Sequence, residues 1–211
     1  MSTNKLPQIE IRSFGKPLEL RKLDKKGFIG TLAGYAIVYG VESRDMGGWR
    51  EIIAKEAFTE SLRAGKDVRM LYQHSSAQIM ARESAGTLRL REDEEGVFFE
   101  ADLTDTQLNR DAYLNVEQRN LDAMSFGMPY ASVVARWERA PAPKKYDLRT
   151  VTKADVVEIS LVTWAAYEDT TVAARDWQEF QKSEQKPTVD AATSVRLHRN
   201  RLEHEKLRFR S

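Results

Sequence analysis

The chain has 211 residues, a formal net charge of +1 at neutral pH, 41% hydrophobic residues and no cysteine. This length allows one substantial core, and the balanced charge gives no global field that would attract nucleic acid or a membrane surface. The lack of cysteine excludes disulfides, thiolate zinc sites and thiol nucleophiles, and is compatible with a reducing cytosol.

No apolar run approaches the ~20 residues that cross a bilayer. The N-terminal residues Met1–Lys5 lack the apolar region of a signal peptide. We therefore expect a soluble protein without a membrane or nucleic-acid partner.

Strand patterns dominate the chain from its start. Short segments alternate apolar and polar residues, as half-buried strands do, and a longer one carries small residues typical of a bulge or a close contact. The turn-forming residues 93–96 between two such segments predict a hairpin. The expected strands cover residues 8–12, 18–21, 30–39, 87–91 and 97–101.

Helical spacing is less frequent. Residues 55–64 and 106–120 place apolar side chains at helical intervals, the second with Leu108, Ala112 and Val116 on one side. No internal repeat is present. We expect a mainly β, α+β domain over residues 1–174, built as an antiparallel barrel or a curled sheet with a few helices.

The last part of the chain, residues 175–211, differs in charge and composition. It holds nine Lys or Arg and six Asp or Glu residues. A polar linker is expected over residues 181–187, followed by a helix from Ala191 capped by Asp190. Its apolar residues recur every seven positions, so this helix could dock on a partner; a solvated tail is the alternative.

Several kinds of site find no support in the sequence. It contains no phosphate-binding glycine loop, no His-x-x-x-His and no cysteine pair. The acidic run Glu92–Glu95 could attract calcium, but its spacing fits a solvated hairpin tip better than a ligand loop. We therefore expect neither a cofactor nor a metal ion.

His74 is the only histidine in the first 197 residues, and it ends the strand-like run Met70–His74. The other two, His198 and His204, lie in the charged tail. Imidazole is the side chain best suited to proton transfer near neutral pH, so His74 is the leading candidate for acid–base chemistry. A hydrogen-bonded structural histidine is the alternative interpretation.

Ser125 is a candidate nucleophile, because it lies in an apolar stretch with Gly127 two positions on, where backbone could approach a substrate closely. A serine needs a base, and the base needs a group that fixes its tautomer. Glu158 lies in an apolar strand, where a carboxylate is costly unless it is paired. A structural pairing with arginine is its alternative. Ser160 is a rival nucleophile or a hydrogen-bond donor to the site.

Six blocks in order make the chain resemble the prohead serine proteases of tailed bacteriophages, which are distantly similar to the herpesvirus assembly proteases. The resemblance covers about residues 8–175. The blocks are residues 34–39 with 51–58, the strand ending in His74, the hairpin with Gly96, residues 105–106, residues 124–128 and residues 158–162. Lys55-Glu56 replaces a common Pro-Gly, and Trp164-Ala165-Ala166 replaces an aromatic-Pro-Ala run; both departures put loop rigidity in doubt.

The resemblance implies an α+β fold on a closed β-barrel, with His74, Ser125 and Glu158 as catalytic residues. It implies an endopeptidase that cleaves scaffold protein, or the scaffolding segment of the major capsid protein, inside the assembling procapsid in the host cytoplasm. Self-cleavage near a terminus is also implied, and homo-oligomerisation is compatible with it. The alternative is a catalytically silent scaffold or core protein that keeps this fold.

Overall fold

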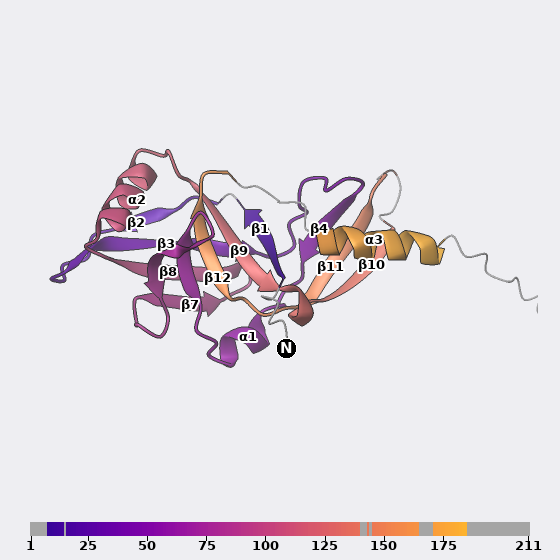
Figure 1. Cartoon of the computed structure of the whole chain (residues 1–211), viewed down its shortest axis with the longest axis horizontal. Helices are drawn as coiled ribbons and strands as arrows, with labels where there is room; N and C mark the ends of the chain where they lie inside the picture. Colours follow the sequence, from indigo (N-terminus) through magenta and orange to yellow (C-terminus); the bar gives the residue numbers. More distant parts are fainter. Residues whose placement is uncertain (1–7, 15, 140–142, 144, 165–170, 185–211) are drawn as a thin grey trace, which may run out of the picture. The chain divides into compact units, whose positions relative to one another are not determined.

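The computed structural model describes residues 8–14, 16–139, 143, 145–164 and 171–184. The chain divides into two compact units, residues 1–172 and 173–211. Figure 1 shows the strands of the first unit with its short helices around them. The predicted division after residue 174 into a protease domain and a tail stays a prediction.

The first unit contains three sheets. The largest has the strand order β1 (Ile9–Phe14), β9 (Ala123–Pro129), β12 (Glu158–Val162), β5 (Arg69–Tyr72) and β6 (Ser75–Arg82). The second has the order β2 (Glu19–Arg21), β3 (Phe28–Val38), β8 (Gly96–Thr104) and β7 (Leu88–Glu92). The third has the order β10 (Val134–Arg139), β11 (Asp147–Lys153) and β4 (Trp49–Ile53).

The expected closed antiparallel barrel is wrong. Across the described residues the three sheets stay open, and no hydrogen-bonded ladder joins the end strands of one sheet into a ring. Closure requires a pairing partner for every edge strand, whereas β1 and β6 each end the largest sheet. The pairing is not purely antiparallel either, because β12 runs parallel to β5 and β11 parallel to β4.

The predicted hairpin is confirmed, with β7 and β8 pairing antiparallel on either side of residues 93–95. Gly96 begins β8 with φ +154°, and a Cβ there would lie 2.0 Å from the carbonyl oxygen of Ile37 on the neighbouring strand. Only glycine allows β3 and β8 to approach so closely at this point. These two strands contribute fully buried side chains to the core, among them Leu32, Ile37, Phe99 and Leu103.

The helix predicted over residues 106–120 is confirmed as α2 (Gln107–Glu117). The Thr106 hydroxyl accepts a hydrogen bond from the Asn109 backbone N–H and so caps the helix. The helix predicted over residues 55–64 is shorter, α1 (Thr59–Arg63). Glu56 has φ +63°, a left-handed conformation that ends helical geometry on that side. Glu56 stands at a position where the resembled family commonly has glycine.

The second unit is described as far as α3 (Thr171–Glu184). This helix continues to Glu184, although a linker was predicted from Gln181. The helix predicted from Ala191 and both tail histidines lie outside the described residues. Among the helices that are described, none is long and apolar enough to cross a membrane.

Candidate active site

His74 lies in a tight turn rather than at the end of a strand. Gln73 and His74 form the two-residue loop between β5 and β6, and both have positive φ values, 52° and 58°. Two such residues are typical of a type I′ hairpin turn, which usually contains Asn or Gly. Each non-glycine residue held there costs about 1–3 kcal/mol, and such strain gathers at functional sites.

Contacts from β12 and the residue after it hold this turn. The Gln73 backbone N–H donates to the Leu161 carbonyl at 3.0 Å, and the Gln73 side-chain amide donates to the Thr163 hydroxyl at 2.7 Å. These contacts hold the turn that carries His74 next to the strand that carries Glu158.

The His74 imidazole contacts Glu158. Its Nδ1 lies 2.8 Å from Glu158 Oε1, and the Ser160 hydroxyl donates to Glu158 Oε2 at 2.6 Å. Because a carboxylate accepts hydrogen bonds, the imidazole proton belongs on Nδ1 and Nε2 is left as the proton acceptor. Glu158 is 7% exposed, so its side chain is buried but paired, as a carboxylate in an apolar strand must be.

Gly127 makes room for this carboxylate. It lies opposite Glu158 in the β9–β12 pair, and a Cβ there would be 2.6 Å from Glu158 Oε1. The sequence suggested that glycine here would admit a substrate. In the structure, the space is filled from within the protein, by Glu158 and by the Ile9 side chain.

Ser125 lies on the same face of the sheet. It is directly opposite Ser160 in the antiparallel pair of β9 and β12, and residues opposite one another share a face. Glu158 is then a diagonal neighbour of Ser125, a relation that separates Cα atoms by about 7–8 Å. The other face of β9 presents Met124 and Phe126 to the core.

Of the three predicted residues, His74 and Glu158 are in direct contact. Ser125 contacts neither through its hydroxyl and is related to Glu158 only by the pairing of β9 with β12. Ser125 is 0% exposed, and its hydroxyl donates to the carbonyl oxygen of Arg12 on β1 at 2.8 Å, not to His74. Ser160, the rival nucleophile, has its hydroxyl engaged by Glu158. Two other acids that could serve as the third residue are paired elsewhere: Asp155 with Lys66 and Asp111 with Gln107.

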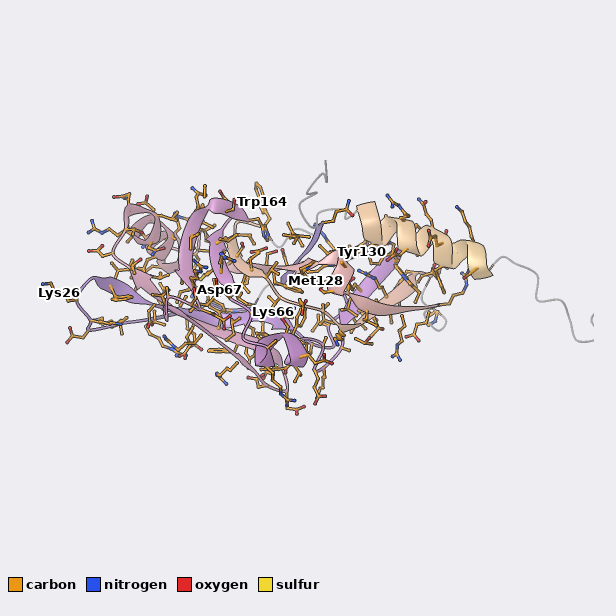
Figure 2. The ribbon with its side chains drawn as sticks, turned by 60° about the horizontal axis from the view of Figure 1, so that its bottom comes forward. Lys26, Lys66, Asp67, Met128, Tyr130 and Trp164 are labelled. Atoms are coloured by element: carbon orange, nitrogen blue, oxygen red, sulfur yellow. The ribbon has the colours of Figure 1, made fainter. Side chains whose placement is uncertain are left out.

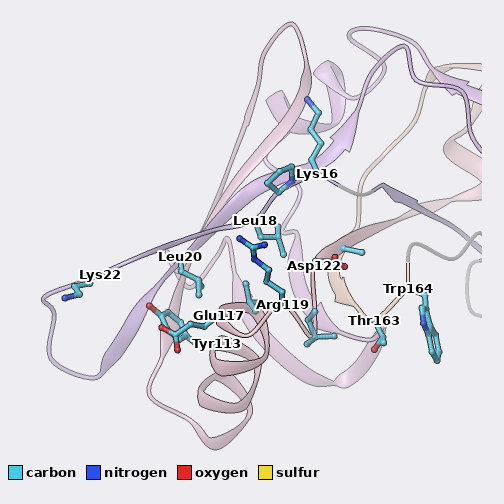
Figure 3. A pocket seen from close by; sticks show the side chains of 14 residues that line it. Lys16, Leu18, Leu20, Lys22, Tyr113, Glu117, Arg119, Asp122, Thr163 and Trp164 are labelled. Atoms are coloured by element: carbon cyan, nitrogen blue, oxygen red, sulfur yellow. The ribbon is translucent and has the colours of Figure 1, made fainter.

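A pocket of about 1030 Å³ opens beside this site. Apolar side chains and a rim of both charge signs line it, as Figure 3 shows. Its lining includes Ala123, which lies two residues before Ser125 on the same face of β9. It also includes Thr163, whose hydroxyl accepts a hydrogen bond from the Gln73 side chain. Trp164 lies at one end of the pocket in Figure 3, is 78% exposed and stands at the surface in Figure 2.

On the opposite face of β1, four charged side chains form a buried group that sequence reasoning missed: Glu10, Arg12, Glu51 and Arg149, each at most 2% exposed. We call it the charge quartet. Arg12 forms a two-pronged pair with Glu51, and its Nη2 donates to Glu10 Oε2 at 2.6 Å. Arg149 Nη1 donates to Glu10 and Glu51, both at 2.7 Å.

Each charge in the quartet supports the others. Burial alone would raise the pKa of Glu51, but the positive charge of Arg12, and then that of Arg149, outweighs it and holds this pKa below 4.5. Burial likewise opposes the charge on Arg12 and Arg149, yet attraction to Glu51 leaves both pKa values raised. Glu51, Arg12 and Arg149 are therefore charged at neutral pH.

Comparison with known proteins places the chain. A solved structure, that of the bacteriophage T4 capsid assembly protease gp21, is similar to it at 12% sequence identity with a TM-score of 0.49, covering 75% of this chain and 98% of the other. No curated protein matches it significantly. The family model for the caudovirus prohead serine proteases matches residues 16–183, most of the chain. The chain therefore belongs to the caudovirus prohead serine protease family.

Proposed function

We propose that the protein is a serine endopeptidase of phage capsid assembly, with Ser125 as nucleophile, His74 as general base and Glu158 as the group that orients His74. The observation that carries this is the 2.8 Å contact of His74 Nδ1 with Glu158, on the sheet face that Ser125 shares. Membership of the prohead protease family supports the same reading.

In this mechanism His74 Nε2 takes the Ser125 proton as the serine oxygen attacks the substrate carbonyl, and later returns it to the leaving amine. Glu158 holds the tautomer and stabilises the imidazolium that forms. Its second oxygen is already fixed by Ser160, so the carboxylate has one orientation. The hydrogen bond of the Gln73 side chain to Thr163 contributes to holding the strained turn in place.

The substrates we propose are the scaffold protein or the scaffolding segment of the major capsid protein, and the protease itself, all cleaved inside the procapsid in the host cytoplasm. The pocket beside Ala123 supports a polypeptide substrate, because its apolar lining and charged rim suit several consecutive side chains. It would take the residues on one side of the cleaved bond.

The test is co-expression of the full chain with the capsid and scaffold proteins of its own phage, followed by intact-mass measurement. We expect the capsid or scaffold mass to fall with time in the presence of the wild-type chain and to stay constant with Ser125→Ala. Masses that stay constant with both would contradict the proposal and favour a silent scaffold or core protein.

Replacing Glu158 by glutamine is expected to slow cleavage about a hundred- to ten-thousandfold while leaving measurable turnover, because the amide no longer fixes the imidazole proton on Nδ1. The measurement is kcat/KM on a peptide taken from the mapped cleavage site. Asp155→Asn is the matched control, since Asp155 pairs with Lys66 at the surface, and it should keep wild-type activity. Wild-type rates in Glu158→Gln would remove Glu158 from the mechanism.

A further inference from the structure

Ser125 is 0% exposed and its hydroxyl is bonded to the Arg12 carbonyl of β1, and a hydroxyl held in this way cannot attack a substrate carbonyl. Its strand, β9, lies between β1 and β12. β12 carries Glu158 and is flanked by β5 on its other side, so its departure would dismantle the site. β1 is the edge strand, and it can leave while the rest of the sheet stays paired.

We propose that the edge of β9 now occupied by β1 is the binding site of the substrate strand, and that β1 is an internal occupant which the substrate displaces. This inference rests on the proposed role of Ser125. β1 pairs antiparallel with β9 from Ile9↔Pro129 to Phe14↔Met124. An extended peptide adds to a sheet edge through the same main-chain hydrogen bonds, so the exchange leaves the bonding of β9 complete.

The contact between β1 and Ser125 resembles the one a substrate must make. The Ser125 hydroxyl donates to the main-chain carbonyl of Arg12 at 2.8 Å, and a serine nucleophile acts on a main-chain carbonyl of its substrate. The Ile9 side chain fills the space beside Gly127 and Glu158. β1 thus supplies the Arg12 carbonyl to the Ser125 hydroxyl, and the apolar Ile9 side chain to the sheet face that carries Ser125 and Glu158.

The attachment of β1 is suited to release. Its inward side chains, Glu10 and Arg12, belong to the charge quartet, whereas Ile9 is 42% exposed. When charged groups leave a buried site, they recover the hydration that burial removed. The two members left behind remain paired, because Arg149 donates to Glu51 at 2.7 Å. β1 also precedes residue 16, where the family match begins.

The test is to lock β1 in place reversibly. The chain contains no cysteine, so Ile9→Cys with Pro129→Cys introduces one disulfide across a directly opposed pair. Cα atoms of such pairs lie about 4.5–5.5 Å apart, within the range that a disulfide spans. The rate at which a fluorophosphonate labels Ser125 is measured in the oxidised and the reduced full-length protein. Ser125→Ala identifies labelling at any other residue.

We expect the oxidised form to be labelled at least about tenfold more slowly than the reduced form, because the reactive state is the one without β1 in place. A matched disulfide in another sheet, Arg89→Cys with Glu100→Cys across β7 and β8, should leave the rate unchanged on oxidation. Equal rates for the two forms of the β1 variant would overturn the inference while leaving the proposed function standing.

Two further measurements keep the inference testable by other routes. Glu10→Gln with Arg12→Gln removes the charges from β1 but leaves the Glu51–Arg149 pair, and should speed labelling. Hydrogen exchange of the wild-type amides needs no chemistry at Ser125: β1 should exchange at least about tenfold faster than β12. Exchange of β1 as slow as that of β12 would show a fixed strand. No labelling in any form, with no cleavage, would contradict the proposed function instead.

Discussion

Ser125→Ala is expected to reduce peptide cleavage by at least about a thousandfold, because covalent catalysis is lost when the nucleophile is removed. The fold should persist, since the substitution creates no large cavity and breaks one hydrogen bond, to the Arg12 carbonyl, worth about 1 kcal/mol. The measurement is kcat/KM, with a urea unfolding curve on the same protein preparation.

The matched control is Ser160→Ala, in the directly opposed position on β12. It removes one hydrogen bond from Glu158 and should cost no more than about tenfold, the effect of losing one donor to a group that is still bonded to His74. The reverse order of effects, with Ser160→Ala the more severe, would assign the nucleophile to Ser160.

His74 should be replaced by asparagine rather than alanine, because asparagine tolerates the left-handed backbone that position 74 adopts. We expect a loss similar to that of Ser125→Ala, and a double variant about as inactive as either single one, since both residues serve the same step. A double variant far less active than both would argue against a shared mechanism.

Local pattern predicted the elements that depend on neighbours in sequence. The β7–β8 hairpin and α2 follow from turn residues, capping and apolar spacing within about fifteen residues. Barrel closure could not be predicted in this way, because it depends on pairing between distant strands. The apolar spacing of residues 55–64 likewise does not show that Glu56 holds a left-handed conformation and so shortens the first helix.

The orientation of β1 also depends on distant parts of the chain and could not be predicted from local pattern. The alternation of residues 8–12 indicated a strand, but not which side faces inward. Apolar residues would be expected inside, yet Arg12 is 0% exposed and Ile9 is 42% exposed. The inward charges are stable because Glu51 and Arg149 supply partners from β4 and β11, far along the chain. Contacts of this kind leave no periodic signal in the sequence.

The residues of the candidate site could be predicted from the sequence, but their spatial setting could not. Residue types and order identified His74, Ser125 and Glu158 as candidates, and a buried carboxylate demanded a partner, which the structure shows to be His74. The type I′ turn at Gln73-His74 was not predicted, because these residues are uncommon there. The hydrogen bond of Ser125 to the Arg12 carbonyl of β1 was not predicted either, since it depends on the strand order of the sheet.

Arg149→Met is expected to destabilise the protein by about 3–5 kcal/mol, the usual cost of removing one partner from a buried ion pair. Arg12 would then face both Glu10 and Glu51, and the buried group would carry a net negative charge. The measurement is the free energy of unfolding from urea curves at neutral pH. Replacing a surface pair member, Lys55→Met opposite Glu94, is the control and should change stability by less than about 1 kcal/mol.

The pH dependence of stability should show the contribution of Glu51 to the quartet. Its pKa is below 4.5 in the folded chain and near 4.5 when unfolded, so its contribution is present above pH 4.5 and is lost as the pH falls through the folded-state pKa. Glu51→Leu with Arg149→Met removes that pair together. It should recover most of the stability lost in Arg149→Met, because an apolar pair of similar volume needs no charge partner. It should also unfold with a shallower dependence on pH below 4.5. A double variant as unstable as Arg149→Met would show that the packing around the quartet, rather than its charge balance, limits stability.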